Sequence, residues 1–319
     1  MLARGTGLVS AAWAKVQDPG LIFFLPYLIS ALLLTLIWLF LVERMHLVAA
    51  LRYLISKFGQ FGSSRSSRLD LYFSIIQVLF LRAPLVAAEA AAFAGMLTVT
   101  TALFASAGIA KSQLALPTAV EAALATIVTM LAIDFASYAV HRLMHAVAPL
   151  WRLHAVHHSA ENLTLLTTYR QHPLEPLLLN LGRGAAAGVG LALLHSLLPT
   201  ETPVVTAYGL GVGFFAYMFT VNLHHSPVPV RYPRIVRMLL VSPHVHHIHH
   251  SALPTHHGTN FGVVFSIWDR LFGTYRDEAV GLGELQFGLG NVDPFRQSLV
   301  ACLLMPLSRI YQPPPPPDF

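Results

Sequence analysis

The sequence predicts an all-α integral membrane protein with about four to five transmembrane helices and a cytoplasmic, histidine-rich helical cap. Three observations lead to this prediction. Charged residues make up only 11% of the 319 residues, and the mean hydropathy is +0.60, whereas soluble domains carry about 25% charged residues. Residues 19–42 contain no charged residue. Of the 17 histidines, all except His46 lie between His141 and His257.

The first predicted span is the uncharged run 19–42, which exceeds the roughly 20 residues needed to cross a bilayer. Two interpretations compete for residues 71–110, where Arg82, Pro84 and Glu89 interrupt the apolar sequence. One is an interfacial helix followed by a span of about 89–110, and the other is two short spans. The uncharged stretch from Ala90 to Ala110 favours the first.

Later apolar stretches predict the remaining spans. One begins after Pro117 and runs to about Val140, and another pair covers residues 174–198 and 202–223. The short turn between the members of this pair indicates an antiparallel hairpin that enters and leaves on one side. A proline run over 313–317 predicts a disordered C-terminal end.

Basic residues follow the first span, in the segment 43–70, which is typical of a cytoplasmic segment. Within it, residues 59–67 are rich in Gly and Ser and predict a loop. Counting spans from a cytoplasmic 43–70 places His141 and His224 on that same side, in either a bacterial inner membrane or the endoplasmic reticulum. The basic residues form no stripe interleaved with aromatic residues, which argues against nucleic-acid binding.

The spacing of the histidines predicts metal ligands. His141 and His145 lie four residues apart, so both imidazoles emerge on one helix face. The motif H-x-x-H-H then occurs twice, and its six histidines are His154, His157, His158, His246, His249 and His250. Eight nitrogen ligands exceed what one metal with open positions requires, so two metals are expected.

Carboxylates are too few for a di-iron site of the soluble helical-bundle type, because only Glu161, Glu175 and Glu201 lie between His141 and Trp268. A metal-binding membrane transporter or sensor is the alternative. Transporters, however, place ionisable groups near the bilayer midplane in repeated halves, and no repeat is visible here. The single cysteine, Cys302, excludes an intramolecular disulfide.

The motifs resemble the histidine boxes of the fatty acid hydroxylase/sterol desaturase superfamily. They are H-R-L-M-H at 141–145, H-A-V-H-H-S at 154–159 and P-H-V-H-H-I-H-H-S at 243–251. T-N-F-G at 259–262 and W-D-R-L-F-G-T at 268–274 resemble the closing segment of that family, and the likeness covers roughly residues 118–276. The domains expected are a membrane anchor over 1–115, a catalytic domain over 116–276 and a tail over 277–319.

The resemblance implies a non-haem di-iron centre that uses O2 to hydroxylate or desaturate a membrane lipid, such as a sterol, fatty acyl or other isoprenoid lipid. Hydroxylation is slightly favoured. Electrons would come from a separate donor, either a cytochrome b5-like protein, a ferredoxin or a reductase. The resemblance adds His224 to the eight spaced ligands. Relatives carry a tenth histidine where this chain has Thr220, and His172, in R-Q-H-P-L-E, is the expected substitute.

The resemblance also marks Tyr138 and Asn260 as candidate catalytic residues. Asp134, seven residues before His141, is expected to accept a hydrogen bond from a ligand imidazole or a neighbouring group. The remaining histidines of this region are not assigned to metal, although His225, His244 and His247 adjoin the boxes. An aromatic run, Phe214, Phe215, Tyr217 and Phe219, could line a lipid tunnel.

Overall fold

The computed structural model describes residues 17–18, 21, 23–109, 116–198, 206–207, 210–211, 221–279, 281, 283–290 and 294–308. The aromatic run at 214–219 and the proline run 313–317 lie outside these residues. The described chain is largely helical, which confirms the all-α part of the prediction, whereas the number of spans and the cytoplasmic cap stay predictions. Three helices are long and apolar enough to cross a membrane: Arg65–Ser106, Thr118–Ala146 and Leu174–Leu197.

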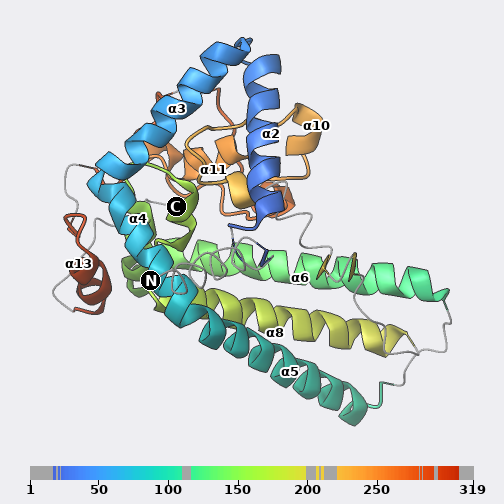
Figure 1. Cartoon of the computed structure of the whole chain (residues 1–319). Helices are drawn as coiled ribbons and strands as arrows, with labels where there is room; N and C mark the ends of the chain where they lie inside the picture. Colours follow the sequence, from blue (N-terminus) through green and yellow to red (C-terminus); the bar gives the residue numbers. More distant parts are fainter. Residues whose placement is uncertain are drawn as a thin grey trace, which may run out of the picture.

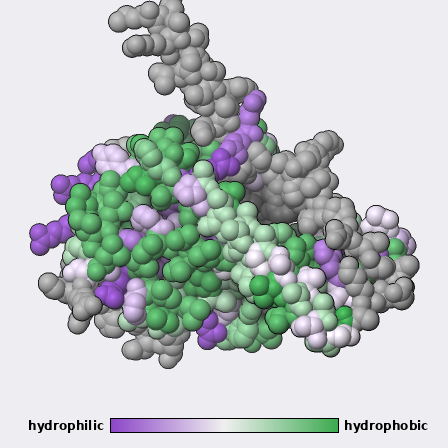
Figure 2. Space-filling model, turned by 90° about the horizontal axis from the view of Figure 1, so that it is seen from below, coloured by the Kyte–Doolittle hydropathy of each residue, from purple (hydrophilic) through white to green (hydrophobic). Residues whose placement is uncertain are grey.

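These helices form a bundle of α5 (Arg82–Ser106), α6 (Thr118–Ala146) and α8 (Leu174–Leu197) that extends away from the histidine-rich part of the chain (Figure 1). Apolar side chains such as Leu79, Val86 and Leu103 are exposed on the helix that contains α5. Figure 2 shows a broad hydrophobic surface on this side of the molecule. Exposed apolar surface of this extent fits helices that face lipid and supports a membrane protein.

Glycines of α8 allow it to lie directly against α5. A β-carbon built at Gly184 would lie 2.2 Å from the carbonyl oxygen of Glu89, and one at Gly188 would lie 2.4 Å from that of Phe93. Gly184 and Gly188 are four residues apart and therefore share one helix face. This small-residue spacing is typical of close helix pairs in membranes.

The predicted loop at 59–67 is wrong, because α3 (Leu47–Ser63) and α4 (Arg65–Ile76) are interrupted only at Ser64. Ser66 and Ser67 are buried, and this tertiary burial overrides their weak helix propensity.

From α4 the chain continues through a π-helical turn, η1 (Gln77–Leu81), into α5. Residues 71–106 are thus one continuous helix. The π turn precedes Pro84, which cannot complete a regular helical hydrogen bond.

The first predicted span is shorter than expected, since α2 covers only Leu25–Leu41, with Pro26 in its first turn. Before it, Asp18 pairs with Arg82 of α5. Helix α2 packs with α3 and with residues 228–232 in a core containing Trp38, Leu39 and Leu54.

Short elements form the rest of the molecule. They are α7 (Ala148–His158), η2 (Leu165–Tyr169), β1 (Thr206–Ala207), β2 (Leu210–Gly211), η3 (Val221–Leu223), α10 (Arg234–Arg237), α11 (Pro243–His249), η4 (Pro254–His256), α12 (Ile267–Leu271), α13 (Leu299–Leu304) and η5 (Met305–Leu307). β1 and β2 pair antiparallel. Most of the predicted helical arm 202–223 lies outside the described residues, but these four strand residues within it are not helical.

Candidate metal centre

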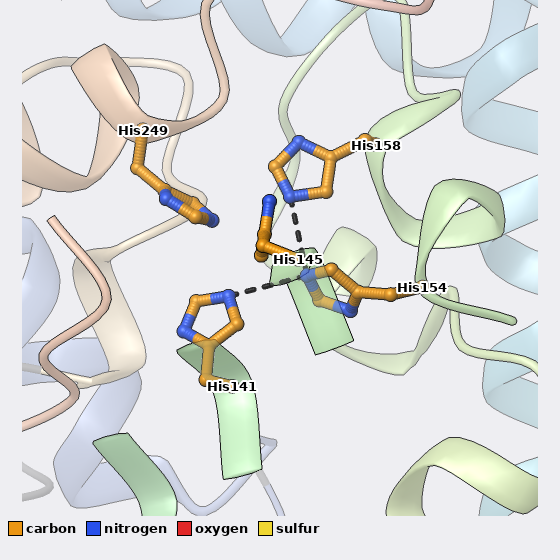
Figure 3. Close-up of side chains that lie close together, drawn as sticks. All are labelled: His141, His145, His154, His158 and His249. Atoms are coloured by element: carbon orange, nitrogen blue, oxygen red, sulfur yellow. Dashed lines mark hydrogen bonds between the residues drawn. The ribbon is translucent and has the colours of Figure 1, made fainter. Parts of the chain in front are cut away.

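Nine histidines converge in two groups. Within each group, one ring nitrogen of every histidine lies within 4.8 Å of those of the other members. Group one consists of His141, His145, His154, His158 and His249. These side chains come from α6, α7 and α11 and point toward one another (Figure 3). Group two consists of His157, His225, His246 and His250.

The two H-x-x-H-H motifs are shared between the groups in a crossed pattern. His154 and His158, the first and last of the earlier motif, lie in group one, while the middle residue, His157, lies in group two. The later motif does the reverse, because His249 is the residue that crosses to the other group. Each motif therefore contributes to both groups and ties them into one centre.

Distances between ring nitrogens suit adjacent ligands of one metal. The Nε2 atom of His154 lies 3.1 Å from that of His141 and 3.2 Å from that of His158. In group two, Nε2 of His225 lies 3.0 Å from that of His246 and 3.1 Å from that of His250. With metal–nitrogen bonds of about 2.1 Å, ligands at right angles are about 3.0 Å apart.

Hydrogen bonds between imidazoles cannot explain this convergence. A neutral imidazole carries one proton, so Nε2 of His225 could donate to only one of the three nitrogens that surround it. The third of these is Nε2 of His157, at 3.1 Å. Burial lowers the pKa of His157 to about 3 and the pKa of His246 well below 6.5, which opposes extra protons. Facing lone pairs require a cation, and the residues therefore fit metal ions.

The opposite ring nitrogens are anchored, as is usual for metal-binding histidines. Nδ1 of His141 donates to the carbonyl of Phe261 at 2.9 Å, and Nδ1 of His249 donates to that of Thr259 at 2.8 Å. Because carbonyls only accept, both Nε2 atoms are left with lone pairs. Nε2 of His249 and both ring nitrogens of His145 are buried without a hydrogen-bond partner among the described residues, so each of these two rings keeps a nitrogen that could bind a metal.

Glu175 was not predicted as a site residue, although it is fully buried and its carboxylate accepts from Nδ1 of His154 at 2.8 Å. Gln171 also donates to this carboxylate, at 3.0 Å. The signal in the sequence was the scarcity of carboxylates among the histidines. A buried carboxylate bonded to an imidazole orients the ring and raises its basicity.

His225 was likewise not assigned, because spacing alone cannot choose between the two members of the pair 224–225. The structure places His225 in group two, with Nδ1 at 3.0 Å from the Thr168 hydroxyl. His224 lies outside both groups, but its ring stacks on His246 with centroids 4.6 Å apart. His172 is also outside, where its Nε2 donates to the carbonyl of Leu303 at 3.2 Å.

Asp134 supports the centre indirectly. Its carboxylate accepts from the backbone N–H groups of Val264 and Phe265 and from the indole of Trp268 at 2.9–3.0 Å. These are neighbouring groups rather than an imidazole. Asp134 therefore fastens the segment after the last histidine motif onto α6.

Tyr138 and Asn260 lie beside the same segment. The Tyr138 hydroxyl contacts that of Thr274 at 3.2 Å and accepts from Arg142. Asn260 has a positive φ of 59°, a conformation that Asn tolerates better than most residues. Its amide donates to the carbonyl of Val245 and its oxygen accepts from the backbone of Arg276, so it shapes the loop that carries Phe261.

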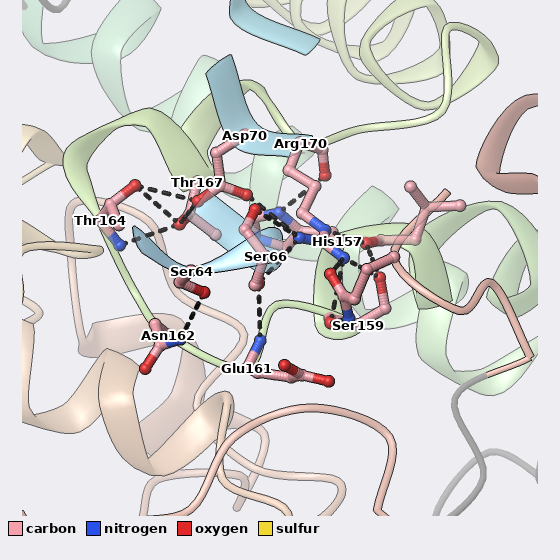
Figure 4. Close-up of polar contacts among 12 residues, drawn as sticks. Ser64, Ser66, Asp70, His157, Ser159, Glu161, Asn162, Thr164, Thr167 and Arg170 are labelled. Atoms are coloured by element: carbon pink, nitrogen blue, oxygen red, sulfur yellow. Dashed lines mark hydrogen bonds and ion pairs between the residues drawn. The ribbon is translucent and has the colours of Figure 1, made fainter. Parts of the chain in front are cut away.

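A buried network connects α4 to His157 (Figure 4). The guanidinium of Arg170 is fully buried and pairs with Asp70, also fully buried, at 3.2 Å. It also donates to Ser66 and Ser159. The backbone carbonyl of the same Arg170 accepts from Nδ1 of His157 at 3.2 Å. The network thus sets the position of one ligand of group two.

These features define a helical protein with membrane-type helices and a buried centre of nine described histidines suited to two metals. Residues 126–274, just under half of the chain, match the family model described as fatty acid hydroxylase. The match confirms the resemblance inferred from the motifs.

Curated relatives include lipid-oxidising enzymes. An ornithine lipid hydroxylase of Rhizobium tropici is 31% identical over 45% of this chain and 39% of its own length. An alkylglycerol monooxygenase of Caenorhabditis elegans is 30% identical over 46% of the chain and 26% of its own length. A sterol 5(6)-desaturase of Aspergillus fumigatus is 29% identical over 45% of the chain and 36% of its own length. The matched part of the chain thus spans less than two fifths of the length of each of these relatives. No solved structure matches it significantly.

Proposed function

We propose that this protein is a membrane oxygenase that inserts one oxygen atom of O2 into an unactivated C–H bond of a membrane lipid. The observation that carries the proposal is the convergence of nine buried imidazoles in two adjoining groups, with lone pairs that face one another. The relatives support the reaction class, because they include a lipid hydroxylase, a monooxygenase and a desaturase.

The proposed cofactor is a pair of iron ions, one held by each group. Imidazole nitrogen suits iron, and the bound irons would supply the reduction of O2 that allows attack on a C–H bond. The balanced overall reaction converts R–H, O2, two electrons and two protons into R–OH and H2O. A separate electron-donor protein would supply the electrons, and hydroxylation is proposed ahead of desaturation.

The residues of the chain have defined tasks in this proposal. The carbonyls of Phe261 and Thr259 and the carboxylate of Glu175 hold imidazole N–H groups, so that the opposite nitrogens stay aimed at the metal. All nine imidazoles are buried, and their exposed fractions are 8% or less. This burial keeps bulk water from the reacting atoms. The helices α5, α6 and α8 would cross the membrane, with the centre at its cytoplasmic face.

Metal content per chain tests the proposal, measured by elemental analysis on gently purified full-length protein and by Mössbauer spectroscopy after growth on iron-57. Two magnetically coupled irons are expected. Membranes supplied with 18O2 should then contain a lipid with one 18O atom, and its mass identifies the substrate. A single zinc per chain or bound haem would contradict the proposed cofactor, and an unlabelled lipid pool despite two irons would contradict the reaction.

A further inference from the structure

A cavity of about 860 Å³ lies between α2, α3, residues 161–166 and the segment with residues 281, 283 and 285–287. Part of its wall consists of Pro227 and His247, which are close neighbours in sequence of the group-two residues His225 and His246. Leu166 lies two residues before Thr168, the partner of His225. The segments that carry and support group two therefore also line the cavity.

The cavity has the size and lining of a lipid-binding pocket. Pockets for small ligands occupy about 300–1,000 Å³ and are mostly apolar with a few polar groups. Here the apolar wall includes Phe23, Leu28, Phe58, Leu163 and Phe287. Helices α2 and α3, which form one side, expose further apolar residues to the outside, so lipid chains would find a continuous apolar surface.

Two side chains of opposite charge, Lys57 and Glu161, line this cavity, and neither forms an ion pair among the described residues. Lys57 of α3 takes part in no ion pair among the described residues, and its ammonium lies 5.5 Å from the ring centroid of Tyr53. Glu161 also takes part in no ion pair within the described chain, although its backbone N–H donates to Ser66. The Tyr53 hydroxyl is buried and has no partner among the described atoms, which leaves a donor free for a ligand.

We propose that the cavity binds the headgroup of the lipid substrate and that Lys57 and Glu161 select a zwitterionic headgroup. This inference rests on the proposed function. An anionic group of the headgroup would pair with Lys57, and an ammonium would pair with Glu161. A purely anionic headgroup repels Glu161, and an uncharged one leaves both charges unmatched. Such mismatches generate specificity as effectively as added attraction does.

Lipid retention by the purified, metal-loaded full chain tests this inference. The probes are phosphatidylethanolamine, phosphatidylglycerol and diacylglycerol with identical acyl chains, counted on the protein by native mass spectrometry. The zwitterionic phosphatidylethanolamine should be retained most. Lys57→Gln should lower retention of phosphatidylethanolamine and phosphatidylglycerol about three- to fivefold, the size expected for a partly exposed ion pair. Glu161→Gln should remove the preference for phosphatidylethanolamine over phosphatidylglycerol.

Two control variants separate the cavity from the general lipid-facing surface. Arg52→Gln changes an exposed cation on the same helix that does not line the cavity, and it should leave retention unchanged. Leu285→Trp fills the cavity from its C-terminal wall and should lower retention of phosphatidylethanolamine to that of diacylglycerol.

Equal retention of the three lipids, or equal losses in the Lys57→Gln and Arg52→Gln variants, would overturn the inference. This outcome differs from failure of the proposed function. If the headgroup preference holds but iron and 18O incorporation are absent, the cavity binds lipid and the oxygenase proposal fails. If iron and 18O incorporation are present without any effect of Lys57 or Glu161 on headgroup preference, the headgroup inference alone fails.

Discussion

The two histidine groups differ in the number of imidazoles and in what positions them. Group one gathers five and group two gathers four. The pair His141 and His145 supplies two imidazoles from one helix face, whereas the residue four before His225 is Val221, so that segment supplies only one. A six-coordinate metal would keep about one open position in group one and about two in group two. The more open group is also the one whose chain segments line the cavity.

The two groups also differ in the residues that hold their imidazoles in place. Group one is anchored by the carboxylate of Glu175 and by two carbonyls of the loop 259–261, which the three hydrogen bonds to Asp134 help to hold. Group two depends on Arg170 and on the Thr168 hydroxyl. Each group can therefore be disturbed through its own supporting residues while the ligands of the other stay unchanged.

The largest effect is expected from Asp70→Asn, which leaves the buried guanidinium of Arg170 without its counter-charge. Breaking a buried ion pair from one side costs about 3–5 kcal/mol. Thermal unfolding of the purified protein should show this loss, and metal analysis should show depletion of group two before group one, because Arg170 positions His157.

Asp18→Asn is the matched control, because Asp18 pairs with Arg82 where both side chains are about one third exposed. An exposed pair contributes about 0–1 kcal/mol, so this variant should unfold close to the wild type. Equal losses in the two aspartate variants would show that the Arg170 network does not determine the stability of group two.

The second prediction compares His225→Ala with His224→Ala. Group two would fall from four ligands to three in the first variant, and we expect loss of about one metal per chain and a decrease in turnover of at least about 100-fold. His224 stacks on His246 without joining either group, so its replacement should keep both metals. Metal loss in the His224 variant with retention in the His225 variant would reverse the assignment.

How far the sequence predicts this architecture depends on the range of the interactions involved. Spacing within one helix is local, and the eight histidines of the three motifs between His141 and His250 lie in the two groups that could hold a metal. Whether they bind metal stays a prediction. The crossing of His157 and His249 between groups depends on how α7 faces α11, which no local pattern encodes. The same holds for His225 and Glu175, whose partners lie 25 and 21 residues away in sequence. The loop predicted at 59–67 is wrong because the buried contacts of Ser66 outweigh the low helix propensity of serine.

Glu175→Gln tests the support of group one. The amide keeps the size of the side chain but replaces the negatively charged carboxylate that accepts the hydrogen bond from Nδ1 of His154. Loss of such a supporting partner typically lowers metal affinity about 10–100-fold. A chelator competition should show this shift for one metal of the two, since the described hydrogen bonds of the Glu175 carboxylate go to His154 and Gln171 and not to an imidazole of group two. Equal weakening of both metals would mean that the crossed motifs couple the groups more strongly than their separate supports suggest.

The smallest effect is expected from Trp268→Phe, which removes one of the three donors to Asp134 and keeps an aromatic ring against Phe135. A hydrogen bond to a charged group contributes about 1.5–3 kcal/mol, and the two backbone donors that remain should limit the loss to the lower end of that range. Both metals should stay bound, because Asp134 contacts no imidazole and acts only through the position of the loop 261–265. The measurement is a thermal unfolding curve paired with metal analysis. Selective loss of the group-one metal in this mild variant would show that the carbonyl of Phe261 controls His141 more tightly than Glu175 controls His154.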